Sequence, residues 1–239
     1  MKKLLFALMS VLLLAACAAD KEFVSPEKDY AKAKRLIDEE AYNQAAMYLE
    51  KFPANYPYSN YTIQAEILRA YASYKGGEYP LAEILCEEFI DRHPRHPDIA
   101  YIKYLLGMTH FKEIARIEND QKQTIAAIES FEKLIDEHPG TQYAKEVKGR
   151  LQKLYNRLAE HELFIGKFYF DKNRYVAAAN RFQGILKKYQ TTPAIEEALY
   201  YLAASYSALK LKDDAKQIAT LLQHNYPSSE WSEKAAELH

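Results

Sequence analysis

A pattern of small residues and turn residues recurs five times along this chain, and it limits the possible folds more than any other feature. Each copy ends at a proline or similar stop that follows a tyrosine or histidine, with small residues twelve and twenty-four positions before the stop. The stops are Pro57, Pro94, Pro139, Gln190 (with Pro193 just after it) and Pro227; the middle positions are Ala45, Ala82, Ala127, Ala178 and Ala215; the first positions are Ala33, Ala70, Ala115, Gly166 and Ala203. Small residues let two helices approach closely, and proline ends a helix. Each copy therefore predicts one pair of packed helices.

Helix pairs of this kind must stack on one another, because a single pair cannot bury its apolar face. Residues 70–94 are the clearest copy, with a tight turn predicted at Gly76 and Gly77. The chain has only seven glycines, which favours helices over turns and strands. We therefore expect an all-α solenoid of five helix pairs. The register of small residues, aromatic residues and proline resembles the tetratricopeptide repeat, and this resemblance implies a right-handed superhelix.

The copies differ in length, and the longer ones predict where the regular stacking changes. The stops lie 37, 45, 51 and 37 residues apart. The extra residues of the third copy are expected at 117–122. Those of the fourth fall in residues 141–170, which lack proline and predict one helix of about 30 residues. This helix would join a front half, residues 27–140, to a back half, residues 141–239, which ends in a short helix within 231–239.

The first residues have the composition of a targeting segment. Lys2 and Lys3 precede an apolar run that is too short to span a membrane comfortably, so residues 1–16 are predicted to be a signal peptide. The run ends Leu-Ala-Ala-Cys17, which resembles the bacterial lipobox and implies that Cys17 carries acyl chains. Residues 17–26 would then be a lipidated tether, and Ala18 after the cysteine implies sorting to the outer membrane. A plain secreted protein is the alternative.

No constellation of residues predicts catalysis. His161 and Glu162 begin like a zinc-protease motif, but Ile165 stands where the second ligand should be. His93 and His96 flank a turn without a third metal ligand nearby in the sequence. Phosphate loops and dinucleotide fingerprints are missing from the sequence, and the net charge of −1 does not suggest a nucleic-acid partner. We expect a binding protein without enzymatic activity or cofactor.

Tyrosines and basic residues instead predict a recognition surface. In tetratricopeptide arrays the first helix of each pair lines the concave groove. That register places the following residues in the groove: Tyr30 and Lys34 from the first pair, Gln64, Tyr71, Tyr74 and Lys75 from the second, and Lys112 and Arg116 from the third. Aromatic rings could bury side chains of an extended peptide, and a base could hold a carboxylate. The alternative is that the tyrosines pack between helices and the basic residues form a solvated face.

Several segments resemble the BamD family, lipoproteins of the β-barrel assembly machinery. Residues 96–107 resemble its His-Pro…Tyr…Tyr…Gly segment. The segments 56–61, 71–82, 157–159 and 180–184 are similar to further family segments, and the likeness covers essentially the whole mature chain. Residues 117–123 are shorter than an insertion found in some members, which leaves any contact of that insertion in doubt.

The resemblance implies a location, partners and site residues. The protein would lie at the periplasmic face of the outer membrane, bind the periplasmic domains of the insertase BamA with its back half, and meet other Bam lipoproteins. Arg181 would form a salt bridge to the insertase. The front half would receive unfolded outer membrane proteins through a C-terminal signal that ends in an aromatic residue and a carboxylate, and Tyr56 joins that predicted site. Alternatives are a pilotin-like lipoprotein that aids a secretin and a scaffold for a cell-wall enzyme.

Overall fold

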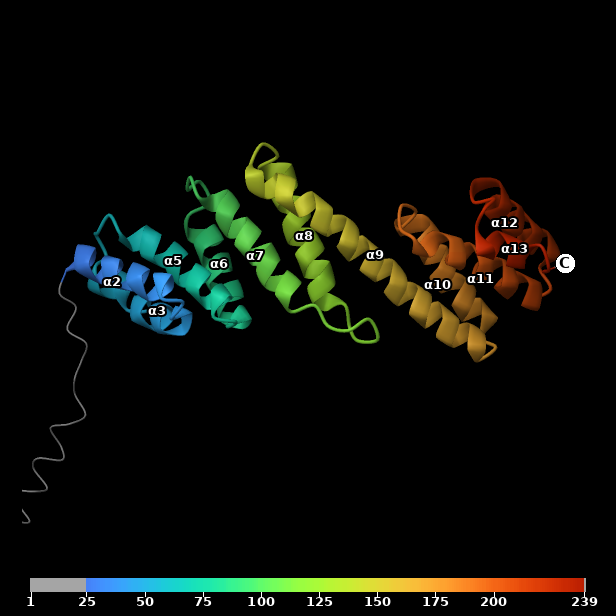
Figure 1. Ribbon diagram of the computed structural model, residues 1–239, viewed down its shortest axis with the longest axis horizontal. Coiled ribbons are helices and arrows are strands. Elements are labelled where there is room, and N and C mark those ends of the chain that lie inside the picture. Colours follow the sequence, from blue (N-terminus) through green and yellow to red (C-terminus); the bar gives the residue numbers. More distant parts are fainter. Residues whose placement is uncertain (1–24, 239) are drawn as a thin grey trace, which may run out of the picture. The chain divides into compact units, whose positions relative to one another are not determined.

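The computed structural model describes residues 25–238, which form helices joined by turns, without a strand in that range (Figure 1). The helices are α2 (Pro26–Asp38), α3 (Tyr42–Leu49), α4 (Phe52–Asn55), α5 (Thr62–Lys75), α6 (Tyr79–Arg92), α7 (Ile99–Lys112), α8 (Lys122–Glu137), α9 (Gln142–Asp171), α10 (Tyr175–Lys188), α11 (Ala194–Ala208), α12 (Lys212–Asn225) and α13 (Glu230–Ala235). The predicted all-α array of helix pairs is confirmed. The lipobox and the signal peptide lie outside the described residues.

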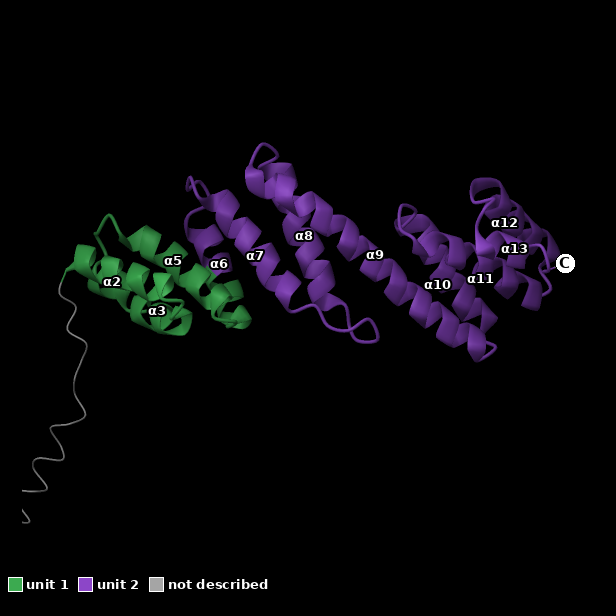
Figure 2. Cartoon of the chain, viewed as in Figure 1, with its two compact units in different colours: residues 1–85 green, residues 86–239 purple. Residues whose placement is uncertain are grey.

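The chain divides into two compact units, Met1–Leu85 and Cys86–His239, and α6 runs across their boundary (Figure 2). The predicted functional division, front half 27–140 and back half 141–239, lies elsewhere and stays a prediction. In unit 1, Phe52 and Leu49 are fully buried with Ala33 and Ala65 in the core of the first pair. In unit 2, one core joins α9, α10, α11, α12 and α13.

The predicted stops between pairs all form the same turn. In each, the N–H of the tyrosine or histidine before the stop donates to the carbonyl four residues back, and its own carbonyl accepts from the N–H three residues ahead. These residues are Tyr56, His93, His138, Tyr189 and Tyr226. The backbone thus leaves the helix in the same way at all five stops, including the one at Gln190, where proline comes only three residues later.

The turns inside four of the five pairs also share one conformation. Each has a residue of positive φ: Glu40 at 56°, Gly77 at 82°, Asn173 at 57° and Lys210 at 63°. The next N–H donates to a carbonyl five residues back at 2.8–2.9 Å, which is the Schellman ending of a helix. Only the second pair uses the glycine that this conformation favours, so the sequence revealed this turn once.

The third pair is different, because residues 113–121 separate α7 from α8. A Cβ at Gly166 in α9 would lie 2.4 Å from Cε1 of Phe182 in α10, and one at Gly107 in α7 would lie 2.4 Å from Cε1 of Phe131 in α8. Gly107 is therefore the close-packing position of the third pair. The prediction of Ala115 was wrong, because counting back from the stop ran through the inserted loop.

The long helix α9 has the predicted length of 30 residues and begins at the N-cap Thr141, whose hydroxyl accepts from the N–H of Ala144 at 3.2 Å. Its first turns contact α7 and α8, where the ring of Tyr143 packs 5.2 Å from that of Tyr104. Its last turns contact α10 and α11, where Phe170 packs 5.2 Å from Tyr201. One helix thus takes part in the core on both sides of unit 2.

Candidate functional site

Two of the tyrosines predicted to bind substrate, Tyr30 and Tyr56, are half-buried and pack against the core of the first pair. The Tyr30 ring stacks on Tyr61 at 5.1 Å. The hydroxyl of Tyr56 donates to Asp29 Oδ2 at 2.6 Å, and that of Tyr48 donates to Asp29 Oδ1 at 2.6 Å. Asp29 is buried, so the two hydroxyls replace water that the carboxylate has lost. Burial and Asp29 together raise the pKa of Tyr56 to about 12. For Tyr30 and Tyr56 the packing alternative describes the geometry.

A second group in unit 1 combines half-buried aromatic side chains with the exposed Lys75. Tyr71 meets Tyr42 edge to face at 6.4 Å, and Lys75 Nζ lies 5.3 Å from the centre of the Tyr42 ring. Tyr74 packs 6.0 Å from Tyr79. Lys75 borders a shallow hollow of about 390 Å³ that is otherwise formed by residues 40–44 and Gly76. The Tyr42 ring thus joins Tyr71 to Lys75, while Tyr74 packs separately on Tyr79. Tyr71, Tyr74 and Gln64 are half-buried, and Lys34 is exposed on α2.

The two predicted residues of the third pair belong to unit 2. Lys112 is the exposed last residue of α7. Arg116 lies in the loop after α7, its side chain is 84% exposed, and it pairs with Glu118 at 3.4 Å. The inserted loop therefore removes Arg116 from the helix face that the repeat register predicted for it.

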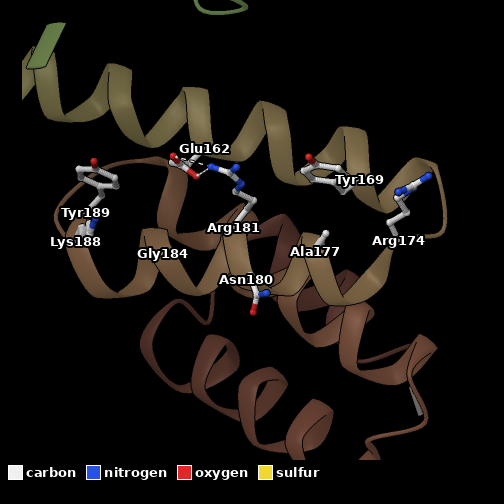
Figure 3. A pocket seen from close by; sticks show the side chains of 9 residues that line it. All are labelled: Glu162, Tyr169, Arg174, Ala177, Asn180, Arg181, Gly184, Lys188 and Tyr189. Carbon is white, nitrogen blue, oxygen red and sulfur yellow. Dashed lines mark hydrogen bonds and ion pairs between the residues drawn. The ribbon is translucent and has the colours of Figure 1, made fainter. Parts of the chain in front are cut away.

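A second candidate site is a surface cavity between α9 and α10 (Figure 3). A cavity of about 610 Å³ is lined by Glu162, Tyr169, Arg174, Ala177, Asn180, Arg181, Gly184, Lys188 and Tyr189. Arg181 rises from α10 toward α9, where its Nη1 donates to Oε2 of Glu162 at 3.1 Å. Burial and the Glu162 charge raise the pKa of Tyr189. The Arg181 side chain is 41% exposed, so a second carboxylate can approach it.

A neighbouring cavity of about 910 Å³ lies between α8, α9 and the inserted loop, and it shares Glu162, Lys188 and Tyr189 with the first. Two α9 side chains hold the loop: Arg157 donates to the carbonyl of Ala115, and His161 Nδ1 donates to the carbonyl of Ile117 at 2.6 Å. His161 therefore has a structural contact, in place of the zinc-protease role that the sequence already disfavoured.

For residues 25–238 the sequence predicts no metal-binding or catalytic cluster. No group of three or more His, Cys, Asp or Glu side chains in that range is placed to hold a metal ion. Cys86 is fully buried, as predicted for a core residue, and burial raises the pKa of its thiol. Within the same range no helix is both long and apolar enough to cross a membrane. Cys17 lies outside the described residues, so its lipidation stays a prediction.

Comparison with known proteins places this architecture in a family. The YfiO model, described as outer membrane lipoprotein, matches residues 24–221. The outer membrane protein assembly factor BamD of Rickettsia prowazekii is 36% identical over 234 residues, which cover 96% of this chain and 93% of that protein. The chain belongs to the BamD family. BamD of Neisseria gonorrhoeae is 32% identical over 248 residues, which cover 96% of this chain and 93% of that protein.

Among solved structures, the TPR2AB domain of yeast Sti1 in complex with pHSP90 aligns with a TM-score of 0.44 and 18% identity, covering 88% of this chain and 81% of that one. That likeness is too low to support an argument about function. For this BamD family member, the predicted contact of Arg181 with the insertase stays a prediction, and the sequence did not indicate the ion pair between Arg181 and Glu162. The two residues lie nineteen positions apart on different helices, and only an i to i+4 pairing on one helix could have been predicted.

Proposed function

We propose that this chain is a lipid-anchored outer membrane lipoprotein, facing the periplasm, that works in the β-barrel assembly machinery. It serves as a scaffold and as a receptor for unfolded outer membrane proteins, and it binds and regulates the insertase BamA. The observation that carries the proposal is similarity to outer membrane protein assembly factors along nearly the whole chain. An array of helix pairs with exposed grooves suits a non-catalytic binding role.

The insertase contact is proposed at Arg181, because its guanidinium borders a cavity and keeps donors free beside Glu162. A carboxylate of the insertase would bind those donors as a charge-assisted pair. Arg181→Glu should weaken binding of the periplasmic domains of BamA by about tenfold or more, because an acid replaces the base and repels the incoming carboxylate.

Titration calorimetry with the purified full chain measures this effect, and circular dichroism checks the helices. Lys187→Glu is the matched control, since Lys187 is an exposed base on the same helix that does not line the cavity. Equal affinity of Arg181→Glu and wild type would reject the Arg181 assignment. Loss of helicity in Arg181→Glu would mean that the pair with Glu162 is needed for folding.

The receptor site is proposed at Tyr71, Tyr74 and Lys75 in unit 1, where rings and a base share one surface. A photoreactive residue at position 71 should crosslink to a nascent outer membrane protein, because Tyr71 contacts the Tyr42 ring that Lys75 also contacts. One at position 30, which packs on Tyr61 outside that group, should not. Equal crosslinking from both positions would contradict this choice of surface. Co-purification with a secretin in place of a barrel insertase would favour the pilotin-like alternative, and recovery of a cell-wall enzyme would favour the third.

A further inference from the structure

The cavity beside Arg181 is bounded by a regular stripe of α10. Arg174, Ala177, Arg181, Gly184 and Lys188 follow one another at alternating spacings of three and four residues. This is the spacing of a helix-packing seam, which keeps all five on one side of the helix. Figure 3 shows the three basic residues distributed along α10 beside α9. Arg181 and Lys188 lie seven residues apart on α10, about 10.5 Å along the helix axis, and Arg174 is the N-cap seven residues before Arg181. We call these three basic residues the ladder.

The stripe residues between the three basic residues, Ala177 and Gly184, are small. A Cβ added at Gly184 would meet no atom within 4 Å, so the space above it is open. Ala177 presents only a methyl group. The backbone of a partner can therefore approach α10 between the basic side chains, while Tyr169 and Tyr189 border the cavity as aromatic side chains.

The charge of the cavity is positive and largely unneutralised. Glu162 is its single acidic residue, and it contacts Arg181 through one guanidinium nitrogen. Arg174 and Lys188 form no ion pair with any residue in the range 25–238. Two full positive charges at the ends of the ladder thus lack a protein counter-ion in the described part of the chain.

The sign of the charge changes beyond Lys188. The neighbouring cavity is lined by Asp120 from the inserted loop and by Glu129 and Glu132 from α8, against the single base Lys122 on that side. An acidic partner would be attracted along the ladder and repelled past its Lys188 end. The basic region therefore has a defined length, from the N-cap of α10 to its last residue.

We propose that this seam binds a partner helix whose acidic residues recur every seven positions. The proposal rests on the proposed function and extends it, from one contact at Arg181 to three contacts along α10. Matching heptad spacing lets each carboxylate meet one base, and the small residues let the two helices lie close together. The occupant is an acidic helix of a protein partner.

The test compares two double variants of the full chain that lose the same charge. Arg174→Gln with Lys188→Gln removes the outer rungs, and Lys172→Gln with Lys187→Gln removes exposed bases that do not line the cavity. The probe is the periplasmic domains of BamA. The variant that lacks Arg174 and Lys188 should bind them about tenfold more weakly than wild type, because each partly exposed ion pair contributes about threefold to the affinity. Its affinity should also depend less on salt concentration. The control variant should stay within about twofold of wild type.

Equal affinities of the two double variants would overturn the proposal that Arg174 and Lys188 contact the partner. If Arg181→Gln still weakened binding in that case, the proposed function would stand while this inference failed. If Arg181→Gln and both double variants all bound like wild type, the insertase contact itself would be wrong. A helical peptide with glutamates seven residues apart should also bind more tightly than a permuted peptide of the same composition. Equal binding of the two peptides would refute the heptad register.

Discussion

The close contact between α9 and α10 makes a definite prediction for Gly166→Ala. The added methyl would lie 2.4 Å from Cε1, 2.8 Å from Cζ and 2.9 Å from Cδ1 of Phe182. Phe182 cannot yield easily, because its ring is fully buried and stacks on Tyr201 at 5.6 Å. The methyl must therefore push two helices apart or force the ring out of its rotamer.

Two opposing contributions set the change in the free energy of unfolding of Gly166→Ala. Replacing a helical glycine by alanine gains about 0.5–1 kcal/mol in helix propensity. Overpacking a filled core costs about 1–3 kcal/mol. Gly166→Ala should thus lower the free energy of unfolding by up to about 2.5 kcal/mol, with about 1 kcal/mol as the central value. For a chain of this size that central value corresponds to a fall in melting temperature of about 2–4 °C. Gly149 lies on the same helix with no atom within 4 Å of its added Cβ, so Gly149→Ala should raise stability by about 0.5–1 kcal/mol.

Urea unfolding followed by circular dichroism measures both variants against wild type. The double variant Gly166→Ala with Phe182→Leu should be less destabilised than the sum of its single variants, because the smaller side chain makes room for the methyl. Stabilisation of Gly166→Ala to the level of Gly149→Ala would refute the close contact. Additivity in the double variant would show that the cost of Gly166→Ala arises elsewhere.

Two further predictions concern the first pair and the anchor. The pKa of Tyr56 is raised to about 12 from a usual value near 10, so the stability from its bond to Asp29 is fully present below about pH 10 and lost as pH rises through 12. Tyr56→Phe should flatten this alkaline loss in melting curves, whereas Tyr58→Phe, at a side chain 98% exposed, should melt like wild type across the range; identical curves for all three proteins would contradict the assignment. Cys17→Ala should move the protein from the outer membrane fraction to the soluble periplasmic fraction, and unchanged fractionation would rule out the lipid anchor.

The sequence predicted the fold well wherever local chemistry repeats. The five predicted stops all coincide with the same turn, four of them at a proline and one at Gln190. The tyrosine or histidine before the stop is common to all five. Residues 141–170 predicted α9 because they lack any residue that ends a helix. In the third pair the predictions for Ala115 and Arg116 were wrong, because a fixed spacing was carried across an insertion whose position the sequence had also indicated.

The candidate sites were less predictable, because tyrosine suits both a core and a surface. Tyr30 and Tyr71 occupy first helices of neighbouring pairs and are both half-buried, yet Tyr30 packs on Tyr61 while Tyr71 packs on Tyr42 beside Lys75. Their difference depends on which rings other helices supply, and a single-helix pattern does not contain that information. The Asp29 cluster was missed for the same reason, since its two donors come from residues 48 and 56.

The continuity of α9 has a consequence for how the back of the chain unfolds. In an array of separate pairs, each pair can open while its neighbours stay folded. Here the single helix α9, from Gln142 to Asp171, packs on α7 and α8 at one end and on α10 and α11 at the other. When either end of α9 unfolds, the helices packed on its other end lose part of the surface against which they pack. Amide protons at the centre of α9 should accordingly exchange only through an opening that both ends share, so the third and fourth pairs melt as a single cooperative block.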